Sequence, residues 1–82
     1  MNAPSPSGSL VRKRSVSIRG HATSFSLEDA FFEIIETIAR QRGISVAALV
    51  AEIDDARDKR ANLSSALRLY VLEWVKRGGK AV

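Results

Sequence analysis

The side chains best suited to meet a polyanion gather near the start of the chain. Residues 1–27 hold Arg12, Lys13, Arg14 and Arg19 and no acidic residue, whereas residues 28–82 hold nine acidic and nine basic residues. A cationic segment on a nearly neutral body favours contact with phosphates. The sequence therefore predicts that these four side chains, together with His21, contact phosphate. The competing interpretation is that Arg12–Arg14 is a solubilising tail.

Catalytic chemistry has little support. The chain has one histidine and no cysteine, and it carries no glycine-rich loop that could cradle a phosphate. Asp54, Asp55 and Asp58 lack the spacing of a calcium loop, with its central glycine and terminal glutamate. We therefore expect no enzyme, no metal site and no cofactor.

The length of the chain limits how much apolar surface a single chain can bury in its own core. A chain of 82 residues forms at most one small domain, and without cysteine it has no disulfide to stabilise it. Oligomerisation is the remaining remedy. We expect neither a signal peptide nor a membrane span, because the opening residues lack a basic and apolar leader and no apolar run reaches about 20 residues. This predicts a soluble, cytoplasmic protein.

The segment before the helices alternates like a strand. Phe25 and Leu27 share one face with Thr23, and small residues occupy the other face, namely Ala22, Ser24 and Ser26. Val16 and Ile18 fall on the opposite parity, so residues 14–19 are either a strand joined through a bulge at Gly20 or a flexible arm. With no obvious hairpin partner in the chain, we expect this strand to pair antiparallel with its copy in a second chain.

Three helices are expected after the strand. The first runs from about 28 to 42, with Ser26 or Leu27 as N-cap and Gly43 as its end. The second begins at Ser45 and ends near 57, and the third begins at Asn62 and ends near 77. The charged residues 54–60 either extend the second helix or link it to the third. The domain boundaries follow: a flexible basic arm at 1–13, a folded domain at 14–77 and a flexible tail at 78–82.

A strand, a helix, the turn Gly43-Ile44-Ser45 and a second helix resemble the ribbon-helix-helix DNA-binding fold of MetJ- and Arc-type repressors. The resemblance covers residues 21–53, with weaker support to 77. Residues 14–28 and 62–68 also resemble a subgroup of short, single-domain bacterial proteins. The chain departs from this pattern in its third helix and in its short base-facing side chains.

The resemblance implies roles for individual positions. It implies that Ala22, Ser24 and Ser26 face the bases. It implies that the backbone amides of Ile44, Ser45 and Val46 bind phosphate at a helix N-terminus. In the homodimer that it implies, we expect the core to be formed by Phe25, Leu27, Phe32, Ile35 and Leu49.

The sequence thus predicts a mainly α protein with one N-terminal strand, which forms an intermolecular two-stranded antiparallel ribbon in a homodimer. We expect a sequence-specific transcriptional repressor that inserts this ribbon into the major groove of duplex DNA and associates with the nucleoid when bound. Whether the dimers assemble into higher oligomers on DNA is left open. The alternative is a protein-interaction module, antitoxin-like or an adaptor, whose basic arm binds an acidic protein.

Overall fold

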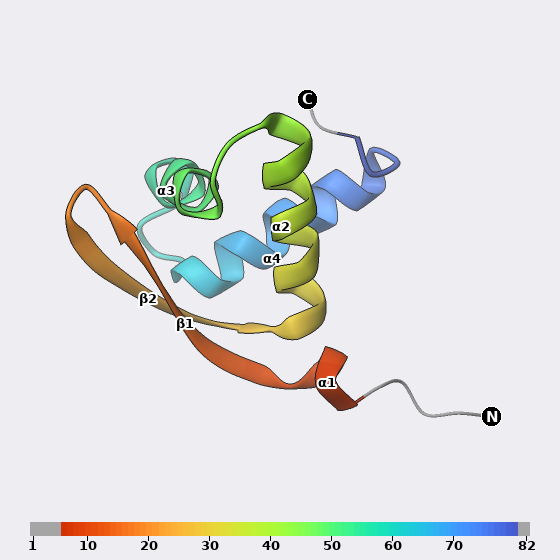
Figure 1. Cartoon of the computed structure of the whole chain (residues 1–82), viewed down its shortest axis with the longest axis horizontal. Helices are drawn as coiled ribbons and strands as arrows, with labels where there is room; N and C mark the ends of the chain where they lie inside the picture. Colours follow the sequence, from red (N-terminus) through yellow and green to blue (C-terminus); the bar gives the residue numbers. More distant parts are fainter. Residues whose placement is uncertain (1–5, 81–82) are drawn as a thin grey trace.

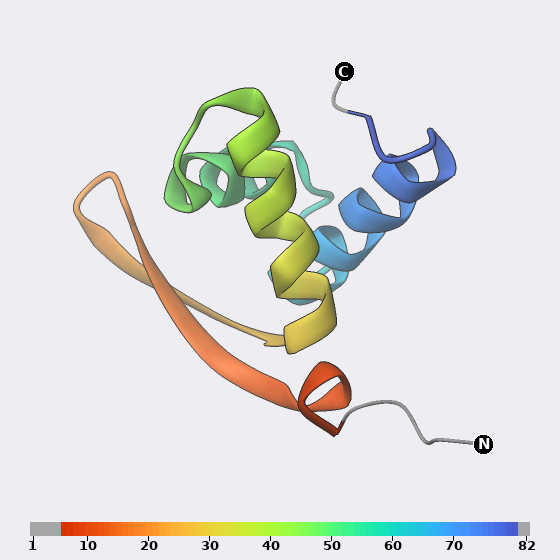
Figure 2. The ribbon, with the colours of Figure 1, turned by 45° about the vertical axis from the view of Figure 1, so that its right-hand side comes forward.

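The computed structural model describes residues 6–80 as a short helix followed by a two-stranded hairpin, which packs against three longer helices (Figure 1). In chain order the elements are α1 (Pro6–Ser9), β1 (Val11–Ile18), β2 (His21–Glu28), α2 (Asp29–Arg42), α3 (Val46–Ala56) and α4 (Leu63–Lys76). The turn of the hairpin lies on the side of α3, and its open end lies at the start of α2. The short α1 packs beside the first turn of α2, as Figure 2 shows. The fold is that of a β-ribbon followed by helices.

The ribbon forms within one chain. β1 and β2 pair antiparallel, with Ile18 opposite His21 and Val11 opposite Glu28. Arg19 and Gly20 make the two-residue turn with φ of 52° and 81°. Two successive positive φ values are the mark of a type I′ turn, whose twist matches that of paired strands. Closing such a short loop costs little chain entropy, so the local partner is favoured.

This hairpin corrects the predicted pairing of β2 with a second copy. It also replaces both interpretations of residues 14–19, because Gly20 lies in a turn and not in a bulge, and the residues before it form a strand. Residues opposite each other in the register share a face, so Val16 and Ile18 join Phe25 on the inner face without a bulge. The alternation of Val16 and Ile18 was recognised, but its change of parity at Gly20 comes from a turn that pairs β1 with β2 and not from a bulge.

The boundaries of the predicted segments shift accordingly. Since β1 begins at Val11, Arg12 and Lys13 lie in the strand and not in an arm. Residues 1–5 of the predicted arm and 81–82 of the predicted tail lie outside the described residues. The ribbon therefore begins before residue 14.

The helix ends follow local hydrogen bonding. Ser45 caps α3 by accepting the N–H of Ala48 at 3.0 Å, and Asn62 caps α4 by accepting that of Ser65 at 2.8 Å. Both predicted caps are confirmed. The predicted cap of the first helix is wrong, since the N-cap is Glu28, which makes no side-chain capping bond. Gly43 ends α2 in the left-handed conformation, with φ of 69°, as predicted.

The core lies between the inner face of the hairpin and the three long helices. Within the described residues, every buried side chain is apolar. The buried residues are Ile18, Phe25, Leu27, Ile35, Ile38, Ala39, Leu49, Val50, Ile53, Leu63, Leu67 and Val71. All three helices and the hairpin contribute, so α4 is part of the same core as the ribbon. Burial of this kind is the main stabilising contribution in a small domain.

Candidate nucleic-acid interface

Between the turn and the last pair at its open end, Val11 and Glu28, the outer face of the hairpin is exposed and, apart from Lys13, built from small side chains. The register places Lys13 opposite Ser26, Ser15 opposite Ser24, and Ser17 opposite Ala22. All six side chains are exposed. The hydroxyls of Ser15 and Ser24 lie 3.2 Å apart, so they bridge the two strands. We call these six residues the outer face of the ribbon.

The outer face contains the three residues that sequence reasoning assigned to base contact, Ala22, Ser24 and Ser26. Lys13 was assigned to phosphate contact instead, and Ser15 and Ser17 were not assigned. The available signal for β1 was Gly20 between two alternating runs, although Arg-Gly is not among the dipeptides that favour a two-residue hairpin turn.

Arg14 lies on the inner side of the ribbon and is held there. Its guanidinium donates to the Asp29 carboxylate, and it lies 4.1 Å from the ring centroid of Phe32. Only 18% of its side chain is exposed. Cation–π contact and the ion pair together tie β1 to the first turn of α2. Arg14 is therefore a structural residue, and its geometry argues against the predicted phosphate contact.

Arg12 and Arg19 are exposed but already have acidic partners. Arg12 Nε lies 3.0 Å from Asp29, and the Arg12 hydrogen bond is the largest cause of a lowered pKa at that carboxyl. Arg19 lies 2.6 Å from Asp55 at the turn end of the ribbon, which raises the pKa of Arg19 and lowers that of Asp55. The ribbon is therefore less cationic than its sequence indicates.

Lys13 and His21 differ from these arginines. Both are exposed, and neither is ion-paired with any acidic group in residues 8–80. Lys13 lies on the outer face. His21 lies beside the turn on the other face, opposite Ile18. Lys13 is thus the cation of the outer face that is available to a ligand.

The N-terminus of α3 offers fewer amides than predicted. The N–H of Ile44 donates to the carbonyl of Ala39 at 3.0 Å, as part of the end of α2. Within residues 6–80, the N–H groups of Ser45 and Val46 have no protein acceptor. These two amides, and not that of Ile44, are open to an anion.

The residues expected in a dimer core pack inside one chain. Phe25, Leu27, Ile35 and Leu49 are buried, and Phe32 is half-buried beneath Arg14. One chain therefore shields these side chains by itself. Large apolar side chains remain exposed elsewhere, including Leu69, Leu72 and Val75 on α4.

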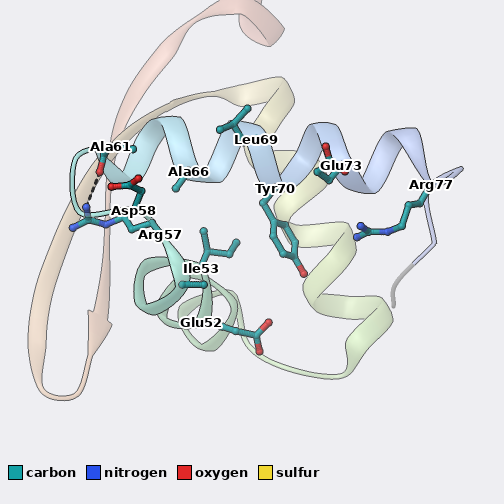
Figure 3. Close-up of a pocket in the computed structure, with 11 residues that line it drawn as sticks. Glu52, Ile53, Arg57, Asp58, Ala61, Ala66, Leu69, Tyr70, Glu73 and Arg77 are labelled. Atoms are coloured by element: carbon teal, nitrogen blue, oxygen red, sulfur yellow. Dashed lines mark hydrogen bonds between the residues drawn. The ribbon is translucent and has the colours of Figure 1, made fainter.

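A groove of about 420 Å³ lies between α3 and α4 (Figure 3). Ile53 of α3 and Ala66, Leu69 and Tyr70 of α4 supply much of its apolar lining. Its charged edge is largely neutralised. Glu52 is bound to Arg42 at 2.5 and 2.9 Å, which lowers the pKa of Glu52.

Across the groove edge, Arg57 donates to the carbonyl of Ala61 at 2.6 Å, and Asp58 pairs with Arg60.

Among the described residues, no cluster of histidine, cysteine, aspartate and glutamate is suited to hold a metal ion. No helix in the described part of the chain is long and apolar enough to cross a membrane.

Comparison with known proteins places this geometry in a family. The profile of the ribbon-helix-helix domain matches residues 11–75, from the start of β1 almost to the end of α4. A solved structure of an uncharacterized protein from Bordetella pertussis Tohama I is 35% identical, with a TM-score of 0.71. The match covers 90% of this chain and 62% of that one. No curated protein matches. The ribbon-helix-helix fold is in general that of DNA-binding regulators, and this chain belongs to the ribbon-helix-helix domain family.

Proposed function

We propose that this protein is a DNA-binding regulator that inserts the outer face of its β1–β2 ribbon into the major groove. The observation that carries the proposal is the exposed outer face on a two-stranded ribbon in a chain of this family. The major groove is about 12 Å wide and admits such a ribbon. Small side chains allow the backbone to approach the base edges closely, and the hydroxyls of Ser24 and Ser26 can donate or accept hydrogen bonds.

Phosphate contacts would flank this ribbon. The amides of Ser45 and Val46 at the start of α3 favour an anion, because the helix dipole adds to two available donors. Arg12 and Arg19 reach phosphates by exchanging their carboxylate partners. The Arg19–Asp55 pair is exposed on both sides, so exchanging its carboxylate for a phosphate costs little. His21 adjoins Arg19 at the turn and is placed to assist it.

We further propose that the protein acts as a homodimer. Because each ribbon is closed within its own chain, the second copy is not needed to complete the ladder. The exposed apolar side chains of α4, Leu69, Leu72 and Val75, support self-association through that helix. Two ribbons related by a twofold axis then read two inverted half-sites. Light scattering should give twice the chain mass, and Leu72→Lys should reduce it to one chain.

Repression by occupancy is the simplest consequence. A dimer bound across a promoter blocks access without catalysis or a cofactor, and we propose that it does so in the cytoplasm. The alternative, a basic arm that binds an acidic protein, loses support because Arg12 and Lys13 lie in β1 and Arg14 is held on the inner face by Asp29 and Phe32, so these residues do not form a free arm.

The test is binding of the full chain to DNA from its own promoter and to a scrambled duplex at near-physiological salt. Preference for the promoter by about 100-fold or more is expected of a sequence-reading regulator. Ser24→Glu should weaken binding by roughly tenfold or more, because it places a carboxylate against the base edges. Gln41→Glu, at an exposed position near the far end of α2, adds the same charge and should leave binding nearly unchanged. Equal loss in both variants would contradict a DNA site on the outer face.

A further inference from the structure

Lys13 is the long side chain of the outer face. The other five members are Ser15, Ser17, Ala22, Ser24 and Ser26, none of which extends beyond one atom past Cβ. Lys13 carries four methylenes and an ammonium with three N–H donors. On this face it is therefore the side chain with the greatest reach from the backbone.

The ammonium group of Lys13 also has no ion-pair partner among residues 8–80. Arg12 and Arg14, on either side in sequence, turn to the inner face and bind Asp29. In residues 8–80 no carboxylate pairs with Lys13, whereas seven of the nine arginines are ion-paired. The strand alternation thus separates one free ammonium from its paired neighbours and directs it outward.

We propose that Lys13 determines sequence specificity by donating hydrogen bonds to the O6 and N7 acceptors of a guanine in the major groove. This inference rests on the proposed function, since it assigns the base read by the same outer face. Guanine presents two adjacent acceptors in that groove, and lysine is one of the two side chains that commonly bind them. The neighbouring serines bond to several base edges and discriminate less.

The position of Lys13 predicts the form of the recognition sequence. Lys13 pairs with Ser26 near the open end of the hairpin, five residues from Ile18 at the turn. At roughly 3.3 Å per residue, this places it about 16 Å along the ribbon from the turn. We expect each ribbon to require one G·C pair at that end of its footprint and to tolerate substitution across the base pairs beneath the serines.

A phosphate contact by Lys13 is the competing role, and the two roles differ in measurable ways. A base contact changes affinity at one base pair. A phosphate contact weakens binding about equally on every sequence and reduces the salt slope by about one. Affinity on a single DNA does not separate these roles, so the experiment must compare sequences.

The experiment selects duplexes from a random pool with the full-length protein and then measures binding of variants to the selected sequence. The wild type should prefer G·C at one position per ribbon by roughly tenfold, and 7-deazaguanine there should lower its affinity because N7 is removed. Lys13→Met should lose both effects, and Lys13→Arg should retain the preference. Lys59→Met, at an exposed position in the loop between α3 and α4, is the matched control and should retain both.

Circular dichroism first verifies that each variant is folded. If Lys13→Met loses affinity uniformly on all sequences, or keeps the wild-type preference, the guanine contact is overturned while DNA binding by the ribbon stands. If the wild type selects no duplex at all, the proposed function itself fails. A preference lost in Lys13→Met and kept in Lys59→Met supports the inference.

Discussion

The two faces of the ribbon use the same strands for different purposes. On the inner face, Phe25 and Leu27 are buried in the core and Arg14 is held by Asp29 and Phe32. On the outer face, every side chain is exposed, and Ser15 and Ser24 meet only each other across the strands. Adjacent residues therefore differ in what their mutation affects. Stability depends on the inward-facing alternate positions of the two strands, and DNA contact is proposed for the outward-facing ones.

The largest expected effect contrasts two neighbours. Leu27→Ala should lower the free energy of unfolding by about 2–5 kcal/mol, because it leaves a cavity at a fully buried position. Ser26→Ala, one residue away on the outer face, should change it by less than about 0.5 kcal/mol. Urea titrations of both variants check the pair. Similar losses would show that the two faces do not differ in their contribution to stability.

Arg14, on the inner face, and Arg19, at the exposed turn, should differ in the same way. Arg14→Gln should destabilise the fold by on the order of 2 kcal/mol, because it removes a charged hydrogen bond and the contact with Phe32. Its effect on the salt dependence of DNA binding should be negligible. Arg19→Gln should do the reverse, because its side chain is 68% exposed and its ion pair adds little stability. An unchanged salt slope in Arg19→Gln would remove that residue from the phosphate contacts.

The turn that brings the two strands together offers a smaller effect. Gly20→Ala should cost about 1 kcal/mol, because φ of 81° is unfavourable for a residue with a Cβ even though the space around it is open. Thermal unfolding measures the loss. Since the hairpin carries both faces, stability and DNA affinity should fall together in this variant. A loss of affinity with full stability would point to a direct role of the turn in binding.

Acid should weaken the ion pair that ties the inner face of the ribbon to α2. The pKa of Asp29 is lowered in the folded state, chiefly by the hydrogen bond from Arg12 and further by Arg14. A lowered folded-state pKa means that the stabilisation is complete above the unfolded value of about 3.9 and is lost as pH falls through the folded value. Stability measured from pH 6 down to pH 2 should decline in this window. Asp29→Asn should flatten that decline relative to wild type, and an unchanged acid limb would contradict the assignment.

Local signals in the sequence were sufficient for the helices. Ser45 and Asn62 were identified as caps and Gly43 as a helix end, because each acts on amides or carbonyls within a few residues. The alternation of Phe25 and Leu27 likewise predicted the inner face of β2. These features depend on neighbours along the chain, and a single sequence records them.

Pairings between distant residues were not readable. A strand over residues 14–19 was one of two alternatives, but its pairing with β2 was missed because the change of parity at Gly20 was interpreted as a bulge and not as a turn. The charge interpretation assumed free arginines, whereas Arg19 finds Asp55 36 residues away. Nothing local in either residue predicts that pair. The candidate site was therefore predicted on β2 and had to be completed on β1 from the register.

One hydrogen bond at the start of α4 has a consequence for association. The backbone N–H of Ser26, on the edge of β2 that faces away from β1, donates to the Ser64 hydroxyl at 3.2 Å. A strand edge with open amides is a template on which further strands add, and such growth leads to aggregation. Ser64 occupies one of these amides, and α4 lies against that edge. The same helix that completes the core thus obstructs the addition of a further strand at the β2 edge of the ribbon.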